Sequence, residues 1–156
     1  MIGVAAFEAH TVTGFPLLTA LIVLPAAVAA IVALLPKQRV DVIRLVGFLG
    51  SVATFVLSVY MLTKFKTGHA GYQFVSDHVW IKSLGIHWKL GVDGISLFLL
   101  VLTGVLFPIA IAGPVVHENV KSYIVWLLVL EAACMGTFLA LDLFVFFVFF
   151  EVVLVP

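Results

Sequence analysis

Two glutamates lie deep within apolar segments and are the residues of this sequence best suited to chemistry. Glu131 lies eight residues after Tyr123, where an uncharged run begins, and Glu151 lies nine residues after Asp142. At about 1.5 Å of helix per residue, both lie roughly 12 to 14 Å along their segments, close to the midplane of a bilayer core about 30 Å thick. A carboxylate at that depth costs roughly 2.5 to 3.5 kcal/mol, so the default interpretation is functional: a proton relay, an ion site or a buried partner.

The alternative for each residue is a protonated glutamate that hydrogen-bonds a neighbouring helix and contributes only packing specificity. Near Glu131, the residues Cys134, Gly136 and Thr137 favour close helix packing, so the two interpretations are balanced there. No Lys, Arg or His lies in the middle of the same segments as a partner for Glu151. Either a basic partner lies outside this stretch, or the carboxyl carries a proton most of the time. The two segments are joined by a minimal turn, so the two carboxylates are expected to approach each other.

The composition requires a membrane. Of the 156 residues, 64% are hydrophobic and 10% charged, and the mean hydropathy is +1.30. Soluble domains have roughly 45–50% apolar and about 25% charged residues, so this chain lacks the polar side chains to cover a water-facing surface. Eight basic and eight acidic residues give no net charge, which argues against nucleic acid as a partner. The single Cys134 can build neither a disulfide framework nor a thiolate metal site within one chain.

Uncharged runs long enough to cross a bilayer predict an all-α integral membrane protein, a polytopic bundle of transmembrane helices with about five spans. They form one membrane domain over 1–156 with one extramembrane loop at 64–94. The last run covers only about 21 Å of a core roughly 30 Å thick, so we expect the sequence to be the opening part of a longer protein. The expected spans are 15–35, 42–63, 95–113, 123–141 and 143–156, with Asp93 and Asp142 as helix caps.

Basic residues in the first short loop indicate the orientation. Lys37 and Arg39 lie between the first two spans, with Arg44 nearby at the start of the second, whereas the first 14 residues contain no Lys or Arg. A signal peptide is therefore not expected, and the positive-inside rule places the amino terminus and the long loop outside. Four lysines at 64, 66, 82 and 89 oppose this orientation, although long translocated loops are poor evidence. A bacterial inner membrane is the expected location, with the mitochondrial inner membrane as the alternative.

The long loop carries the alternating pattern of a strand. Apolar and polar residues alternate from Ile86 to Val92, and 79–81 could pair with this run across residues 82–85. The pattern predicts a short β-hairpin on the membrane surface, with Trp80 and Trp88 at interfacial depth. An irregular loop of interfacial aromatic residues is the alternative.

Other candidate sites are weaker. His69, His78 and His87 lie in one loop at equal spacing, but equal spacing alone does not build a metal site, so we expect water-facing histidines and no metal. No motif for nucleotide, flavin or iron–sulfur binding occurs, and no cofactor is expected in this chain. Glycines 47, 50, 104 and 113 are expected to permit close helix packing.

Two stretches resemble the antiporter-like, proton-translocating subunits of respiratory complex I. The first is Leu84-Gly-Ile-His-Trp-Lys-Leu-Gly-Val-Asp-Gly-Ile-Ser-Leu-Phe-Leu-Leu-Val-Leu-Thr-Gly104, similar to the family's loop leading into its third helix. The second is Phe138-Leu-Ala-Leu-Asp-Leu-Phe-Val-Phe-Phe-Val-Phe-Phe-Glu-Val-Val-Leu-Val-Pro156, similar to its fifth helix. The ending Glu151-Val-Val-Leu-Val-Pro156 is similar to one branch of the family and differs from the sister subunits.

This resemblance implies a proton-pumping module of NADH:quinone oxidoreductase that holds no redox cofactor itself. NADH, FMN, iron–sulfur clusters and quinone would belong to other subunits, and the partners would be the lipid bilayer and other membrane subunits, especially neighbouring antiporter-like ones. In the family, the fifth-helix glutamate, here Glu151, pairs with a lysine on a later broken helix, which would lie beyond Pro156. The family's core proton path has no counterpart of Glu131, so a role for Glu131 in proton transfer is the weaker hypothesis.

Two alternatives remain open at the level of the sequence. The chain could belong to a multisubunit cation:proton antiporter or a membrane-bound hydrogenase, which share the fold. It could also be a structural membrane anchor with no ion path. The sequence after Pro156 and the neighbouring genes would distinguish the first alternative from a complex I subunit. Water around the two glutamates would distinguish an ion path from a structural anchor.

Overall fold

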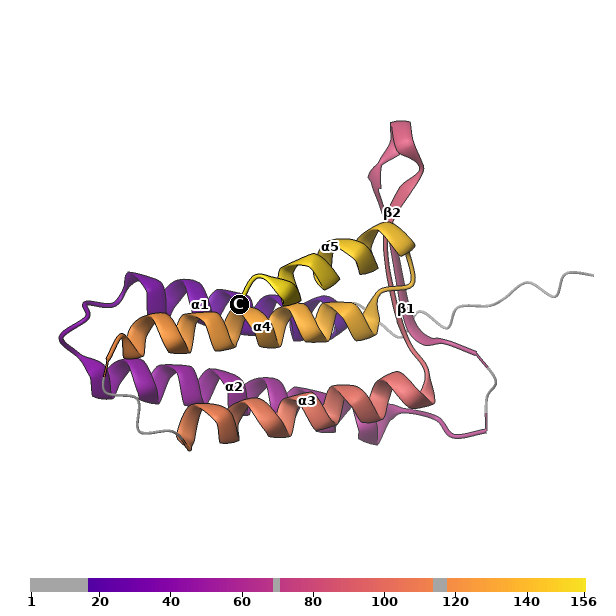
Figure 1. Ribbon diagram of the computed structural model, residues 1–156. Coiled ribbons are helices and arrows are strands. Elements are labelled where there is room, and N and C mark those ends of the chain that lie inside the picture. Colours follow the sequence, from indigo (N-terminus) through magenta and orange to yellow (C-terminus); the bar gives the residue numbers. More distant parts are fainter. Residues whose placement is uncertain (1–16, 69–70, 114–117) are drawn as a thin grey trace, which may run out of the picture.

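The computed structural model describes residues 17–68, 71–113 and 118–156, and in them the chain forms five α-helices and one β-hairpin (Figure 1). The expected all-α membrane architecture is confirmed, because four of the helices are long and apolar enough to cross a bilayer. The fifth is shorter, with 12 residues. The elements are α1 (Leu17–Leu34), α2 (Val40–Lys64), β1 (Gln73–Ile81), a 3-10 turn (Lys82–Leu84), β2 (Ile86–Val92), α3 (Gly94–Ala112), α4 (Val120–Leu139) and α5 (Leu143–Leu154).

The helices coincide with the expected spans to within three residues at every described end. Phe15 and Pro16, expected to open the first span, lie outside the described residues. The expected caps are confirmed. The Asp93 carboxylate accepts a hydrogen bond from Ser96 N at 2.7 Å, and the Asp142 carboxylate accepts one from Phe144 N at 2.8 Å. Each cap satisfies an amide that has no partner within its own helix.

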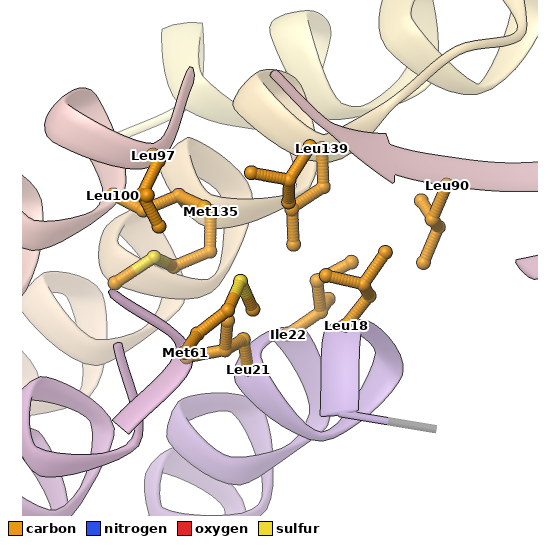
Figure 2. Close-up of a cluster of buried hydrophobic side chains, with 10 residues drawn as sticks. Leu18, Leu21, Ile22, Met61, Leu90, Leu97, Leu100, Met135 and Leu139 are labelled. Carbon is orange, nitrogen blue, oxygen red and sulfur yellow. The ribbon is translucent and has the colours of Figure 1, made fainter. Parts of the chain in front are cut away.

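Helices α1 to α4 run side by side, with α1 beside α4 in one layer and α2 beside α3 in the other, while α5 lies against α4 at an angle (Figure 1). Two apolar clusters fill the bundle at its two ends. Near the hairpin, side chains from α1, α2, β2, α3 and α4 converge (Figure 2). Those drawn with labels are Leu18, Leu21, Ile22, Met61, Leu90, Leu97, Leu100, Met135 and Leu139. The cluster at the other end comprises Ala29, Val32, Ile43, Ile111, Val120, Ile124 and Leu128.

Glycines bring the helices close together, as expected for three of the four positions. A Cβ atom on Gly47 would lie 2.5 Å from Ile124 Cγ2 of α4, and one on Gly50 would lie 2.5 Å from Val28 Cγ1 of α1. A Cβ atom on Gly104 would lie 3.0 Å from the backbone of α2. The expectation for Gly113 is wrong, because the nearest atom to its Cβ position is a carbonyl oxygen of its own helix. Gly113 ends α3 and faces no other helix there.

The loop between α2 and α3 folds into the expected hairpin, which excludes the irregular-loop alternative. Strands β1 and β2 pair antiparallel, with Val79 opposite His87 and His78 opposite Trp88. The turn closes at Gly85, whose φ of 64° lies in the left-handed region that glycine tolerates. Strand β1 begins at Gln73, earlier than the expected 79. The sequence did not reveal its first half, because residues 73–77 do not alternate between apolar and polar.

The hairpin runs across the ends of the helices, and its tip extends past α5 (Figure 1). Strand β2 also bonds the turn between α4 and α5, where Leu141 N donates to the Lys89 carbonyl at 2.9 Å. The Trp80 and Trp88 rings are 5.9 Å apart, and Trp88 lies 5.7 Å from the Phe149 ring of α5. A bundle that crosses a bilayer would thus hold the hairpin along the membrane surface and use it to position α5.

Candidate functional site

Glu131 of α4 lies inside the bundle and is fully buried, with 0% of its surface exposed. Its Oε1 atom accepts a hydrogen bond from Ser51 Oγ of α2 at 3.0 Å. Its Oε2 atom is also buried and has no hydrogen-bond partner among the described residues. Of the described residues with charged side chains, Glu131 alone is buried.

Ser51 belongs to a row of buried hydroxyls, which we call the hydroxyl row: Ser51, Thr54 and Ser58 of α2, all 0% exposed. Spacings of three and four residues place them on one helix face. Thr54 donates to the Gly50 carbonyl at 3.1 Å, and Ser58 donates to the Phe55 carbonyl at 2.7 Å. Because these hydroxyl protons are bonded within α2, the hydroxyl oxygens keep lone pairs that can accept hydrogen bonds.

Little charge surrounds Glu131. Helices α1 and α3 contain no ionisable side chain, and the acidic and basic residues of α2 lie near its two ends. On α4 itself, Cys134 lies one turn further along and Lys121 lies at the start of the helix. The Lys121 ammonium donates to the Leu35 carbonyl at 2.8 Å, beyond the end of α1. None of the ion pairs seen among the described residues includes Glu131.

Glu151 lies two turns into α5, roughly 12 Å from the helix start, and its side chain is exposed on the surface of the described chain. Phe147 and Phe150 are exposed beside it, at 57% and 43%. The helix is thus apolar around a single carboxyl, and the face that carries this carboxyl is exposed.

The structure does not bring the two carboxyl groups together, so the expectation that they approach each other is wrong. Phe149 packs over Gly136 of α4, where a Cβ atom would lie 2.5 Å from the ring. This contact fixes the rotation of α5. Glu151 follows Phe149 by two residues, about 200° around the helix, and therefore points away from α4. Glu131 points toward α2, so the two groups occupy opposite sides of the α4–α5 pair.

The histidines of the loop do not form a cluster in the described structure. His87 Nδ1 lies 2.7 Å from Asp77 Oδ1, and both side chains are near 40% exposed. His78 is opposite Trp88 in the strand register, and His69 lies outside the described residues. Within the described ranges, no group of three His, Cys, Asp or Glu side chains is arranged to hold a metal ion.

Sequence reasoning missed Ser51, the hydrogen-bond partner of Glu131. The signal was present, because hydroxyls at 51, 54 and 58 share a helix face with Gly47 and Gly50. Small and polar residues at this spacing mark the face of a membrane helix that packs against its neighbours. The helix that faces that row, α4, carries the only acidic residue within the four long spans apart from Asp41 at the start of α2.

Comparison with known proteins finds no matching family model. The chain is 41% identical over 145 residues to NADH-quinone oxidoreductase subunit M of Rhodobacter capsulatus, a match covering 90% of this chain and 28% of that protein. It is 38% identical over 141 residues to NADH-ubiquinone oxidoreductase chain 4 of Arabidopsis thaliana, covering 89% and 28%. These relatives confirm the resemblance to subunits of respiratory complex I. The residues from Glu151 to Pro156 indicated one branch of that family, and the relatives named subunit M and chain 4 represent that branch.

A solved structure supports the same conclusion. A chain of respiratory complex I from Thermus thermophilus with bound NADH superposes with a TM-score of 0.72 and 26% identity, covering 89% of this chain and 27% of that one. The chain therefore spans about a quarter of the length of the subunit M relatives that it matches.

Proposed function

We propose that this chain is part of a proton-translocating membrane subunit of an NADH:quinone oxidoreductase, which couples electron transfer from NADH to quinone to proton pumping. The observation that carries the proposal is the carboxyl of Glu151, alone on an apolar helix face, in a chain 41% identical to a subunit M. A carboxyl there needs either a proton or a basic partner. The relatives' names favour this function over the cation:proton antiporter and hydrogenase alternatives.

In this proposal Glu151 takes up and releases the pumped proton. A lysine on a helix outside these 156 residues covers the exposed face of α5 and pairs with the carboxylate. Two unit charges 4 Å apart interact by about 4 kcal/mol at an effective dielectric constant near 20. Withdrawing the lysine removes that stabilisation and shifts the protonation equilibrium by roughly a thousandfold, since about 1.4 kcal/mol corresponds to a factor of ten. The carboxylate then takes a proton from water, and the returning lysine drives it off.

The proposal also assigns partners and orientation. NADH, FMN, iron–sulfur clusters and quinone would bind to other subunits, and this chain would contact the bilayer and neighbouring antiporter-like subunits. Lys37, Arg39 and Lys121 lie at the bundle end opposite the hairpin, which supports placing that end on the cytoplasmic or matrix side and the hairpin outside. The amino terminus, predicted outside, lies beyond the described residues.

The test is Glu151→Gln in the full-length subunit within the intact complex, reconstituted into lipid vesicles. We expect NADH-driven proton uptake to fall about tenfold or more, the scale of losing a group that transfers protons. Glu118→Gln is the matched control, because Glu118 is an exposed carboxyl outside the helices. Unchanged pumping and electron transfer in the Glu151 variant would overturn the proposal and favour the structural-anchor alternative.

A further inference from the structure

Glu131 has a carboxyl that the Glu151 mechanism does not use. Ionised and with only one hydrogen bond, it would incur a desolvation cost of several kcal/mol, which favours the neutral acid. A neutral acid donates one hydrogen bond from the oxygen that carries the proton. Oε1 already accepts from Ser51, so the proton belongs on Oε2, which has no acceptor among the described residues. Buried polar atoms of this kind are normally satisfied by bound water.

The surroundings of Glu131 differ in the two directions along the bundle. Toward the basic end, Gly47 and Gly50 hold α2 against Ile124 and Val28 with no space for a Cβ atom, and the apolar cluster of that end follows. Toward the hairpin end, the hydroxyl row continues from Ser51 for roughly 10 Å along α2, and on this helix the apolar cluster of the hairpin end begins only at Met61. On α3, Gly104 lies against Ser58, and the next residue in the chain before it, Thr103, is also buried.

We propose that Glu131 is a second proton-exchanging group, which passes its proton to water bound along the hydroxyl row. The Thr54 and Ser58 oxygens accept hydrogen bonds from that water, since their own protons are bonded to α2 carbonyls. In the exchange, the O–H bond at Oε2 breaks and the proton passes to water, which becomes hydronium. The carboxylate that remains keeps the hydrogen bond from Ser51, and the reverse transfer restores the acid. The inference rests on the proposed proton-pumping function and adds a second group to it.

Few ionisable groups compete for this role. The helices packed against α4 carry Asp41, Arg44, Tyr60 and Lys64 on α2 and Glu151 on α5, and none on α1 or α3. On α4, Cys134 lies one turn from Glu131, and Tyr123 donates to the Ala110 carbonyl near the basic end. Within these helices, Glu131 is therefore the acid positioned to exchange protons through the hydroxyl row.

The decisive variant is Glu131→Gln in the intact complex, because glutamine preserves size and hydrogen bonding but holds no exchangeable acid proton. A packing role predicts that this variant pumps normally, whereas proton exchange predicts a fall in NADH-driven proton uptake of about tenfold. Infrared difference spectra supply a second readout. The carbonyl band of a protonated carboxyl should disappear in the variant, and in the unmodified complex that band should shift in deuterium oxide as the proton exchanges.

Two further variants test the route. Thr54→Val with Ser58→Ala should slow the deuterium shift, while Thr137→Val, which removes a part-buried hydroxyl of α4 outside the row, should not. Normal pumping in Glu131→Gln, or a carboxyl band that never shifts in deuterium oxide, would overturn the inference. If Glu151→Gln abolishes pumping while Glu131→Gln does not, only this inference fails. If Glu151→Gln pumps normally, the proposed function fails first.

Discussion

The two mid-helix carboxyls lie at similar depth but in opposite environments. Glu131 is enclosed by four helices and hydrogen-bonded by Ser51, whereas Glu151 faces outward from α5 among exposed phenylalanines. The inner carboxyl has a hydrogen-bond partner on a neighbouring helix, whereas the outer one is exposed on the surface of the described chain. The position of a carboxyl along its helix therefore makes it a candidate for function. The helix face on which it lies determines which groups can exchange a proton with it.

The first prediction concerns a substitution that changes the rotation of α5 and therefore moves only the outer carboxyl, Glu151. Gly136→Val places side-chain atoms where the Phe149 ring now packs, so α5 must shift or turn. Overpacking of this kind costs about 1 to 3 kcal/mol. We expect the apparent Tm of the purified complex to fall and proton pumping to drop with it, since Glu151 moves with the helix.

Gly94→Ala is the matched control, because a Cβ atom at Gly94 meets nothing within 4 Å. The infrared band assigned to Glu131 should be the same in both variants. Loss of that band in Gly136→Val would show that the two carboxyls are coupled through α4 and would break the distinction between them.

The sequence predicted well where each helix begins and ends, and poorly toward which neighbour a side chain points. Span boundaries follow from hydropathy, and caps follow from Asp93 and Asp142, because both depend on local properties of the chain. The direction of Glu151 depends on the contact between Gly136 and Phe149, two positions on different helices that no local pattern connects. In a helix such as α5, which is apolar at every position except Glu151, the hydrophobic pattern does not distinguish a buried face from one that faces lipid or another chain.

The same limit explains why Ser51 was missed and the hairpin was found. Alternation from Ile86 to Val92 is a local signal that predicts a strand, and its partner strand lies close by in the chain. The bond between Ser51 and Glu131 joins residues 80 positions apart, so it depends on how α2 and α4 pack. A row of small and hydroxyl residues shows which face of α2 packs, but not against which helix.

The second prediction concerns the inner carboxyl. Ser51→Ala removes the hydroxyl that donates to Oε1 and leaves both carboxyl oxygens of Glu131 without a described partner. Loss of such a bond costs about 1 to 2 kcal/mol, less than the overpacking at Gly136. The apparent Tm should fall by a few degrees, as measured by thermal unfolding of the complex. Ser122→Ala, at an exposed position near the start of α4, should leave it unchanged. An equal loss in both variants would contradict a specific bond to Glu131.

The smallest effect is expected at Asp93, which belongs to neither carboxyl site and caps α3 beside the hairpin. Hydrogen bonds from Ser96 lower the pKa of Asp93 below its ordinary value of 3.8, so the folded state favours the charged cap. Its contribution is complete above the unfolded pKa and is lost as the pH falls through the folded pKa. Asp93→Ala should therefore destabilise the protein by about 0.5 to 1 kcal/mol at neutral pH, and the difference from the unmodified protein should shrink in acid.

Asp93→Asn, which caps without a charge, should show less of this pH dependence in thermal unfolding. Altered proton pumping in either variant would contradict a role for Asp93 in capping α3 alone.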